Sequence, residues 1–166
     1  GIEMSVFVLT DGANYQILPE AKDYKRIGEG DTGLNTGGMG AISPVPFFDE
    51  ALRERTVREV IEPTIQGLVK DNLPYQGFVF FGLINTTKGP KVIEYNVRMG
   101  DPETEVVIPR LETDILDLFV AMHEGTLNEI SVAVNPQTAA TVMAVSGGYP
   151  GSYEKGKAIE GLRRFE

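Results

Sequence analysis

The sequence predicts an α+β fold in which antiparallel β-hairpins are covered by helices. Two apolar runs, Met4–Thr10 and Phe78–Ile84, are rich in branched and aromatic residues and have the length of buried strands. Each run is followed by a turn signal and a second candidate strand, which is the pattern of a hairpin. Between the hairpins, apolar residues recur at helical spacing from Val57 to Val69.

The first hairpin turns at Asp11-Gly12, a dipeptide typical of tight turns, and Tyr15–Leu18 is expected to return beside the first strand. The second hairpin turns within Asn85–Pro90 and returns over Lys91–Arg98. One more strand is expected at Ala139–Val145, before a Gly-Gly-Tyr-Pro-Gly turn.

Three helices are predicted from their start signals. The first begins after Asp49, a favoured N-cap residue, and Pro63 is expected to kink or break it. Asp101-Pro102 combines a capping residue with proline at the first helical position, which favours a second, short helix. The third helix is expected from Asp114 to His123, with Gly125 as its C-terminal stop.

The composition excludes several classes of function. The net charge of −9 over 166 residues argues against binding to nucleic acid, which needs clustered lysine and arginine. The absence of cysteine excludes disulfides, cysteine-bound zinc and thiol nucleophiles, and a single histidine cannot build a multi-histidine metal site. No apolar run approaches the roughly 20 residues that span a bilayer. We therefore expect a cytoplasmic protein that acts on small molecules.

The strand over residues 92–98 carries the most informative polar pattern. Because strand side chains alternate between faces, residues two apart lie roughly 6–7 Å apart on one face. Ile93, Tyr95 and Val97 are expected on one face and Glu94, Asn96 and Arg98 on the other. An acid and an amide supply the hard oxygen ligands that Mg²⁺ prefers, and an arginine can grip a carboxylate or phosphate. A solvated strand face is the plain alternative.

A glycine-rich segment over residues 28–40 is the second signal, and we expect it to form a loop. It formally contains G-x-G-x-x-G, but no strand precedes it and no helix opens at its end, so a dinucleotide site is rejected. A Walker A loop is excluded because no Gly-Lys-Ser/Thr occurs. Its bare amides can approach an anion closely. Lys25 and Arg26, directly before it, can add positive charge, whereas Asp101 and Glu103 are most simply helix-start acids.

Two long motifs resemble the phosphoribosylamine–glycine ligase family, which has the ATP-grasp fold. One runs from Asp23-Tyr24-Lys25-Arg26 through the glycine-rich segment to Ser43-Pro44, and the other is Val-Ile-Glu-Tyr-Asn-Val-Arg-Met-Gly-Asp-Pro-Glu at residues 92–103. The Gly-Gly-Tyr-Pro-Gly segment at 147–151 is also similar. Leu34 and Tyr95 depart from the commoner proline and phenylalanine, and both changes are conservative.

The resemblance implies ATP-dependent ligation of glycine to 5-phosphoribosylamine through glycyl phosphate, with Mg²⁺ or Mn²⁺, in purine biosynthesis. It implies metal ligation by Glu94 and Asn96, and a nucleotide site that includes Glu3 and Lys25. Arg98 and Lys25 would be the catalytic cations, although the choice between Lys25 and Arg26 at the phosphates stays open. The implied substrate-binding residues are Asp31, Thr32, Asn35, Thr36, Gly37, Gly38, Met39 and Arg98.

The resemblance also implies an incomplete fold. Residues 1–136 would be the second half of an ATP-grasp domain, and residues 137–166 would start a C-terminal domain. Gly1 is no initiator, and a strand follows almost at once, so we expect a fragment with negligible ligase activity alone. Two alternatives remain, a degenerate ATP-grasp module that binds without catalysis and another purine-pathway ATP-grasp ligase.

Overall fold

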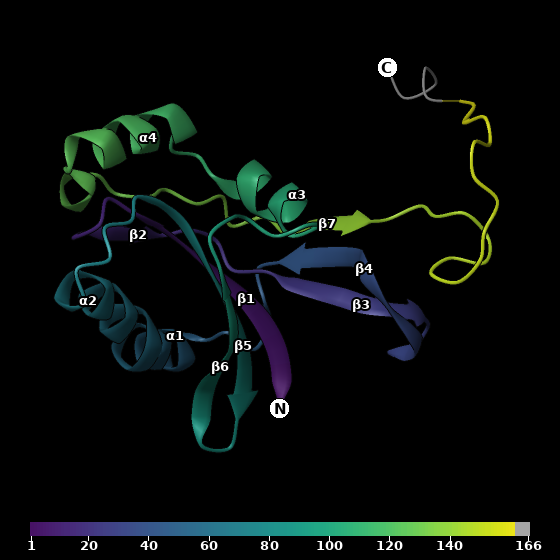
Figure 1. Ribbon diagram of the computed structural model, residues 1–166, viewed down its shortest axis with the longest axis horizontal. Coiled ribbons are helices and arrows are strands. Elements are labelled where there is room, and N and C mark those ends of the chain that lie inside the picture. The colour runs from purple at the N-terminus through teal and green to yellow at the C-terminus, as the bar shows by residue number, and fades with distance from the viewer. Residues whose placement is uncertain (162–166) are drawn as a thin grey trace.

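Two antiparallel sheets form the framework of the computed structural model, which describes residues 1–161 (Figure 1). The larger sheet has the strand order β2-β1-β5-β6, and the smaller has the order β3-β4-β7. Helices α1 and α2 lie on one side of the larger sheet, and α3 and α4 lie on the other (Figure 1). The predicted α+β class is therefore confirmed.

The larger sheet contains both predicted hairpins. Strand β1 (Ile2–Thr10) pairs along its whole length with β5 (Gly77–Thr86), and β2 (Tyr15–Ile17) flanks it on the other side. Strand β6 (Gly89–Asn96) returns beside β5. The hairpin predictions are confirmed, and β6 ends before Arg98.

Both faces of β1 are buried, which explains its continuous apolar run. Odd-numbered Phe7 and Leu9 pack toward α3 and α4, and even-numbered Val6 and Val8 pack toward α1 and α2. The first core also contains Leu18, Ala21, Ala41, Phe80, Val106, Val107, Leu118, Ala121 and Leu127. The second also contains Met4, Leu52, Val60, Ile61, Ile65, Val79, Phe81 and Leu83.

The first predicted helix forms, with a π-helical turn inside it. Helix α1 (Glu50–Thr56) starts where the Asp49 carboxylate accepts a 2.8 Å hydrogen bond from the amide of Leu52. A π-helical turn (Val57–Ile61) then leads into α2 (Glu62–Lys70), whose first turn contains Pro63. The helical run from residue 50 to residue 70 is continuous, so a π-helical turn just before the proline stands where a kink or break was expected. The proline has no amide hydrogen to donate to the preceding turn.

The second predicted helix starts later than expected. Helix α3 spans Thr104–Val107 and continues into a 3₁₀ turn (Ile108–Arg110), so the assignment of Asp101 as its N-cap is wrong. The Thr104 amide instead bonds to the Gly100 carbonyl at 3.1 Å, so a separate turn occupies residues 100–104. Helix α4 (Ile115–Glu124) and a 3₁₀ turn (Leu127–Glu129) complete the helices.

The third helix and its end signals are confirmed. The Asp114 side chain caps the start of α4, and Gly125 adopts a left-handed conformation at its end. None of the helices described over residues 1–161 is long and apolar enough to cross a membrane.

Most of the glycine-rich segment is a strand, so the prediction of a loop holds only for the turn at residues 29–31 and is wrong for the rest. Strand β4 (Thr32–Ser43) pairs with β3 (Lys22–Gly28) and with β7 (Ala139–Val142). Two irregularities in the β3–β4 ladder accommodate the glycines. Residues 139–142 therefore belong to the same sheet as β3 and β4. The domain boundary at residue 137 stays a prediction, and the last five residues of that segment lie outside the described chain.

Candidate functional site

Two adjoining cavities open between the sheets. The larger, of about 400 Å³, is lined by residues of β1, β3 and the β3–β4 hairpin, including Arg26, Asp31 and Asn35. The smaller, of about 100 Å³, extends to Glu94 on β6. Glu3, Asp23 and Lys25 line both cavities, so the two form one continuous site. Sequence reasoning selected six of the seven residues named here, and it missed a role for Asp23.

Lys25 is the central cation of this site. Its ammonium lies 3.5 Å from the Glu3 carboxylate and 3.8 Å from that of Asp23. Burial lowers the pKa of Lys25, but Asp23 and Glu3, with a contribution from Glu94, raise that pKa above its ordinary value. Lys25 is therefore held in its charged form, with acids on several sides.

Asp23 is the buried acid of the pair. Its side chain is only 9% exposed, and burial raises the pKa of the carboxyl, opposed by the charges of Lys25 and Lys22. A signal for it existed in the sequence, because residues 23 and 25 are two apart on a strand and therefore share a face. The ammonium of the half-exposed Lys25 side chain is therefore paired with a carboxylate that is itself buried in the protein.

Glu94 and Asn96 lie on the same side of β6, as the alternation predicted. The Asn96 side-chain amide donates a 3.2 Å hydrogen bond to the Glu94 carboxylate. Tyr95 and Val97 line a groove on the other side of the sheet, also as predicted. Ile93, however, lies beside Glu94, so its predicted placement is wrong. Gly82 pairs with residue 94 and Leu83 with residue 92, which leaves Ile93 as the extra residue of a bulge.

Arg98 follows the strand and does not extend the row of polar groups on it. Its side chain is exposed, and its guanidinium donates a 2.9 Å hydrogen bond to the Met99 carbonyl. No ion pair of Arg98 with a carboxylate occurs in the described part of the chain. Arg98 is thus available to an incoming anion, beside the strand that carries Glu94 and Asn96.

The glycine-rich strand lies opposite Lys25. Tyr24 pairs with Gly40 and Arg26 with Asn35, so one residue of β3, Lys25, faces the four residues 36–39 of β4. The Thr36 hydroxyl donates to the Lys25 carbonyl at 2.8 Å, and the Gly38 amide donates to the Thr36 hydroxyl at 3.0 Å. The predicted substrate-binding residues Thr36, Gly37, Gly38 and Met39 therefore form the bulge beside the cationic centre.

The tip of the same hairpin contains the other predicted substrate residues. Arg26 donates to the Gly33 carbonyl at 3.0 Å and lies 3.9 Å from the Asp31 carboxylate. Asp31 and Asn35 line the larger cavity, whereas the Thr32 hydroxyl is turned to the Glu29 carbonyl at 2.8 Å. Arg26 is engaged within its own hairpin, and Lys25 is the cation that reaches both cavities.

Sequence reasoning also missed Ser5 and Glu103. Glu103 is 4% exposed and accepts a 2.8 Å hydrogen bond from the Ser5 hydroxyl. Its side chain makes no capping bond to α3, so its interpretation as a helix-start acid is incomplete. A serine inside the apolar run of β1 was the available signal, but its partner lies 98 residues away.

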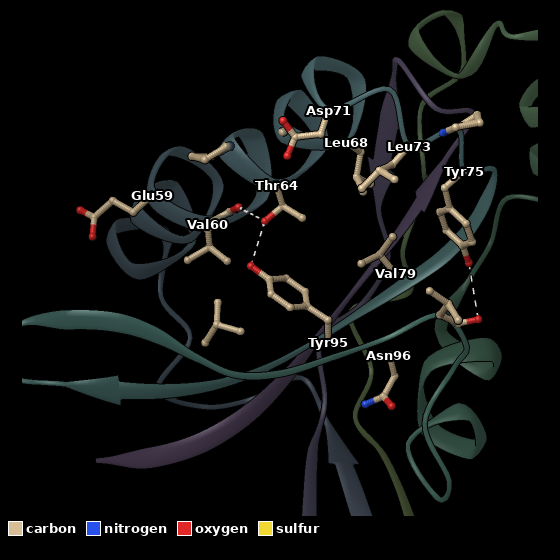
Figure 2. Close-up of a pocket in the computed structure, with 15 residues that line it drawn as sticks. Glu59, Val60, Thr64, Leu68, Asp71, Leu73, Tyr75, Val79, Tyr95 and Asn96 are labelled. Carbon is tan, nitrogen blue, oxygen red and sulfur yellow. Dashed lines mark hydrogen bonds between the residues drawn. The ribbon is translucent and has the colours of Figure 1, made fainter.

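A larger groove lies elsewhere. It has a volume of about 920 Å³ and lies between the π-helical turn, α2 and the other side of the sheet (Figure 2). The Tyr95 ring projects into it toward Thr64, with 3.1 Å between their hydroxyl oxygens. Of the predicted site residues, only Asn96 lines this groove. Because its charged lining residues, Glu59 and Asp71, are both acids, it does not suit a polyphosphate.

The donor set fits a divalent cation bound partly by the protein. Glu94 offers a carboxylate, and rotating the Asn96 amide by half a turn presents its oxygen on the same side. Across residues 1–161, no group of three or more histidine, cysteine, aspartate or glutamate side chains is placed to hold a metal. Glu94 and Asn96 would therefore hold a Mg²⁺ ion only in part, and its other ligands would come from phosphate and water.

Comparison with known proteins gives consistent matches. A family model described as phosphoribosylglycinamide synthetase, ATP-grasp (A) domain, matches residues 1–104. The phosphoribosylamine–glycine ligases of Agrobacterium fabrum and Chlorobaculum tepidum are each 50% identical over 159 residues, or 96% of this chain. The crystal structure of phosphoribosylamine–glycine ligase from Thermotoga maritima matches 94% of the chain with a TM-score of 0.83 and 35% identity.

The chain spans only part of these relatives, 38% and 37% of the two sequences and 39% of the crystal structure. The matches cover both long motifs and the strands that carry Glu3, Lys25, Glu94 and Asn96. The expected ATP-grasp fold is confirmed. From its sequence and its fold together, the chain belongs to the phosphoribosylglycinamide synthetase family.

Proposed function

We propose that the full-length polypeptide ligates glycine to 5-phosphoribosylamine with consumption of ATP, through glycyl phosphate, in purine biosynthesis. The products are glycinamide ribonucleotide, ADP and phosphate. The names of the relatives support this assignment. The observation that carries it is that Glu94, which accepts a hydrogen bond from Asn96, lines the same cavity as the Glu3–Lys25 pair. Residues 1–166 alone are expected to lack turnover, since they span 38% of such a ligase.

Lys25 is the group proposed to meet the ATP phosphates. It lines both cavities, whereas Arg26 lines only the larger one and is bonded within its hairpin. A polyphosphate would compete with Glu3 and Asp23 for the ammonium. Glu3 would then be free to accept a hydrogen bond from the ribose, the role that the family resemblance gives it.

Charge neutralisation is the central task of the site. A glycine carboxylate and a nucleotide polyphosphate repel each other, and catalysis of phosphoryl transfer is largely positioning plus electrostatic stabilisation. A divalent cation on Glu94 and Asn96 would supply two positive charges. Lys25 would hold the phosphates and Arg98 the glycine carboxylate or its acyl phosphate. The bulge at residues 36–39 would close over the substrates with its backbone amides.

The test is steady-state turnover by the full-length protein with Mg²⁺-ATP, glycine and 5-phosphoribosylamine. Glu94→Ala and Asn96→Ala are expected to lower kcat by about 10²–10³-fold, since each removes a group that stabilises charge in the transition state. Their melting temperatures should stay near wild type, because Glu94 is exposed and Asn96 is half-buried. Glu124→Ala, at the exposed end of α4, is the matched control and should leave turnover unchanged.

Two results would contradict the proposal. Nucleotide binding without glycine-dependent release of ADP indicates the non-catalytic module. Turnover that depends on a different acceptor in place of 5-phosphoribosylamine indicates another ligase of the same fold.

A further inference from the structure

Glu103 is a buried carboxylate without a cationic partner. It is 4% exposed, and no lysine, arginine or histidine nitrogen of residues 1–161 lies within 4.0 Å of it. Burial raises the pKa of its carboxyl, and the charge of Asp23 adds to this effect. Burying a carboxylate costs free energy unless it is well paired, so an apolar side chain would stabilise a purely structural position better.

Two neighbours hold the Glu103 side chain in place. The Ser5 hydroxyl on β1 donates a 2.8 Å hydrogen bond to Oε1. On the other side, the carboxylate lies against Gly100, where an added β-carbon would overlap it. The side chain therefore folds back over its own turn and joins residues 100–103 to the middle of β1.

The opposite side of this turn touches the smaller sheet. Gly38 on β4 has φ of 136° and lies against the Pro102 ring, where an added β-carbon would overlap Cδ. Residues 100–103 are thus held between β1, which carries Glu3, and the bulge of β4. Arg98 lies directly before this turn.

We propose that Glu103 is a positioning residue of the ligase reaction, whose hydrogen bond to Ser5 fixes the Arg98–Glu103 segment and the Gly38 strand relative to the nucleotide site. This inference rests on the proposed function, because it assigns Arg98 and the β4 bulge to substrate. In this role Glu103 needs only a side-chain oxygen that is placed to accept the hydrogen bond from the Ser5 hydroxyl. A role as a proton acceptor would instead require its negative charge.

Three substitutions in the full-length enzyme separate the two roles. Glu103→Gln keeps the length and an oxygen for Ser5, so kcat/KM for glycine should stay within about threefold of wild type. Glu103→Asp keeps the charge but is one methylene too short. It should lower kcat/KM for glycine by about 10- to 100-fold, the equivalent of losing one hydrogen bond to a charged group. Ser5→Ala should act in the same direction. KM for ATP should change less than twofold throughout, because Glu3 and Lys25 are untouched.

Glu124→Asp is the control for the loss of a methylene at an exposed position and should behave as wild type. The proposal is overturned if Glu103→Gln is as impaired as Glu103→Asp, or if Ser5→Ala retains wild-type kinetics for glycine. Should wild type show no glycine-dependent turnover, the proposed function fails, and hydrogen exchange then decides the positional claim. The amides of residues 99–101, 103 and 104 should exchange faster in Ser5→Ala and Glu103→Asp than in Glu103→Gln, and equal rates would refute the positional role.

Discussion

Replacing Gly38 with alanine tests whether the glycine-rich strand must lie against the turn after β6. The backbone at Gly38 has φ of 136°, which side chains with a β-carbon rarely adopt. The added carbon would come closer than 3.0 Å to Pro102 Cδ and 3.3 Å from the Asp101 carbonyl oxygen. The proline ring is tied to the backbone, so it cannot move aside as a flexible side chain would.

Two costs add at this position. Overpacking a close contact typically costs about 1–3 kcal/mol. A single residue with an unfavourable backbone conformation costs a further amount of about 1–3 kcal/mol. The free energy of unfolding should therefore fall by at least about 2 kcal/mol, which corresponds to a drop in melting temperature of roughly 2 °C or more in the longer full-length protein. Ligase activity should fall too, because relieving the clash displaces the bulge beside Lys25.

Thermal unfolding of the full-length protein is the assay, and Gly67→Ala is the matched control. Gly67 lies within α2, and an added β-carbon there would meet nothing within 4 Å. This control should raise the melting temperature, because alanine is favoured over glycine in a helix by about 1 kcal/mol. Equal shifts in the two variants, or a rise with Gly38→Ala, would refute the close approach of β4 to Pro102.

Two further predictions concern stability. Asp49→Ala should lower the free energy of unfolding by about 1 kcal/mol through loss of the N-cap, while Asp49→Asn should lose little, as measured by thermal unfolding. At Asp11, burial raises the pKa, but hydrogen bonds from Asn14 and Ala13 outweigh it and hold the pKa below its ordinary value. The ionised carboxylate therefore stabilises the fold above the unfolded-state pKa and loses this effect as pH falls through the folded-state value. Denaturant titrations should show the advantage of wild type over Asp11→Asn shrinking below about pH 4.

The parts of the fold that follow from local pattern were predictable. Strand β1 is buried on both faces, so its apolar run is unbroken enough to identify, and Asp49 and Gly125 mark helix ends by their own chemistry. Alternation also placed Glu94 and Asn96 on one face of β6. Alternation misplaced Ile93 because that residue lies in a bulge. The bulge depends on the register of β6 with β5, and no pattern in the sequence near Ile93 indicates it.

The glycine-rich strand shows a different limit. Glycine, asparagine and threonine at residues 28–40 favour a loop locally, yet pairing with β3 and β7 outweighs that preference. The site is accordingly less predictable than the fold. Lys25 was identified from its motif, but its pairing with Glu3 is set by the packing of β1 against β3. Glu103 could be assigned only after the turn at residues 100–104 was known.

The polar residues of β1 explain why the site lies where it does. Residues 4–10 of this strand are all buried, so a polar side chain among them must find a partner within the protein. Thr10 does so locally, donating to the Asn14 carbonyl at 2.7 Å. Ser5 instead requires the distant Glu103. Only the exposed start of the strand, at Glu3, places a polar group where a ligand can reach it. The buried middle of β1 therefore anchors the turn after β6, and its open end contributes to the cavity. This division would place the proposed nucleotide and substrate groups at one end of the larger sheet.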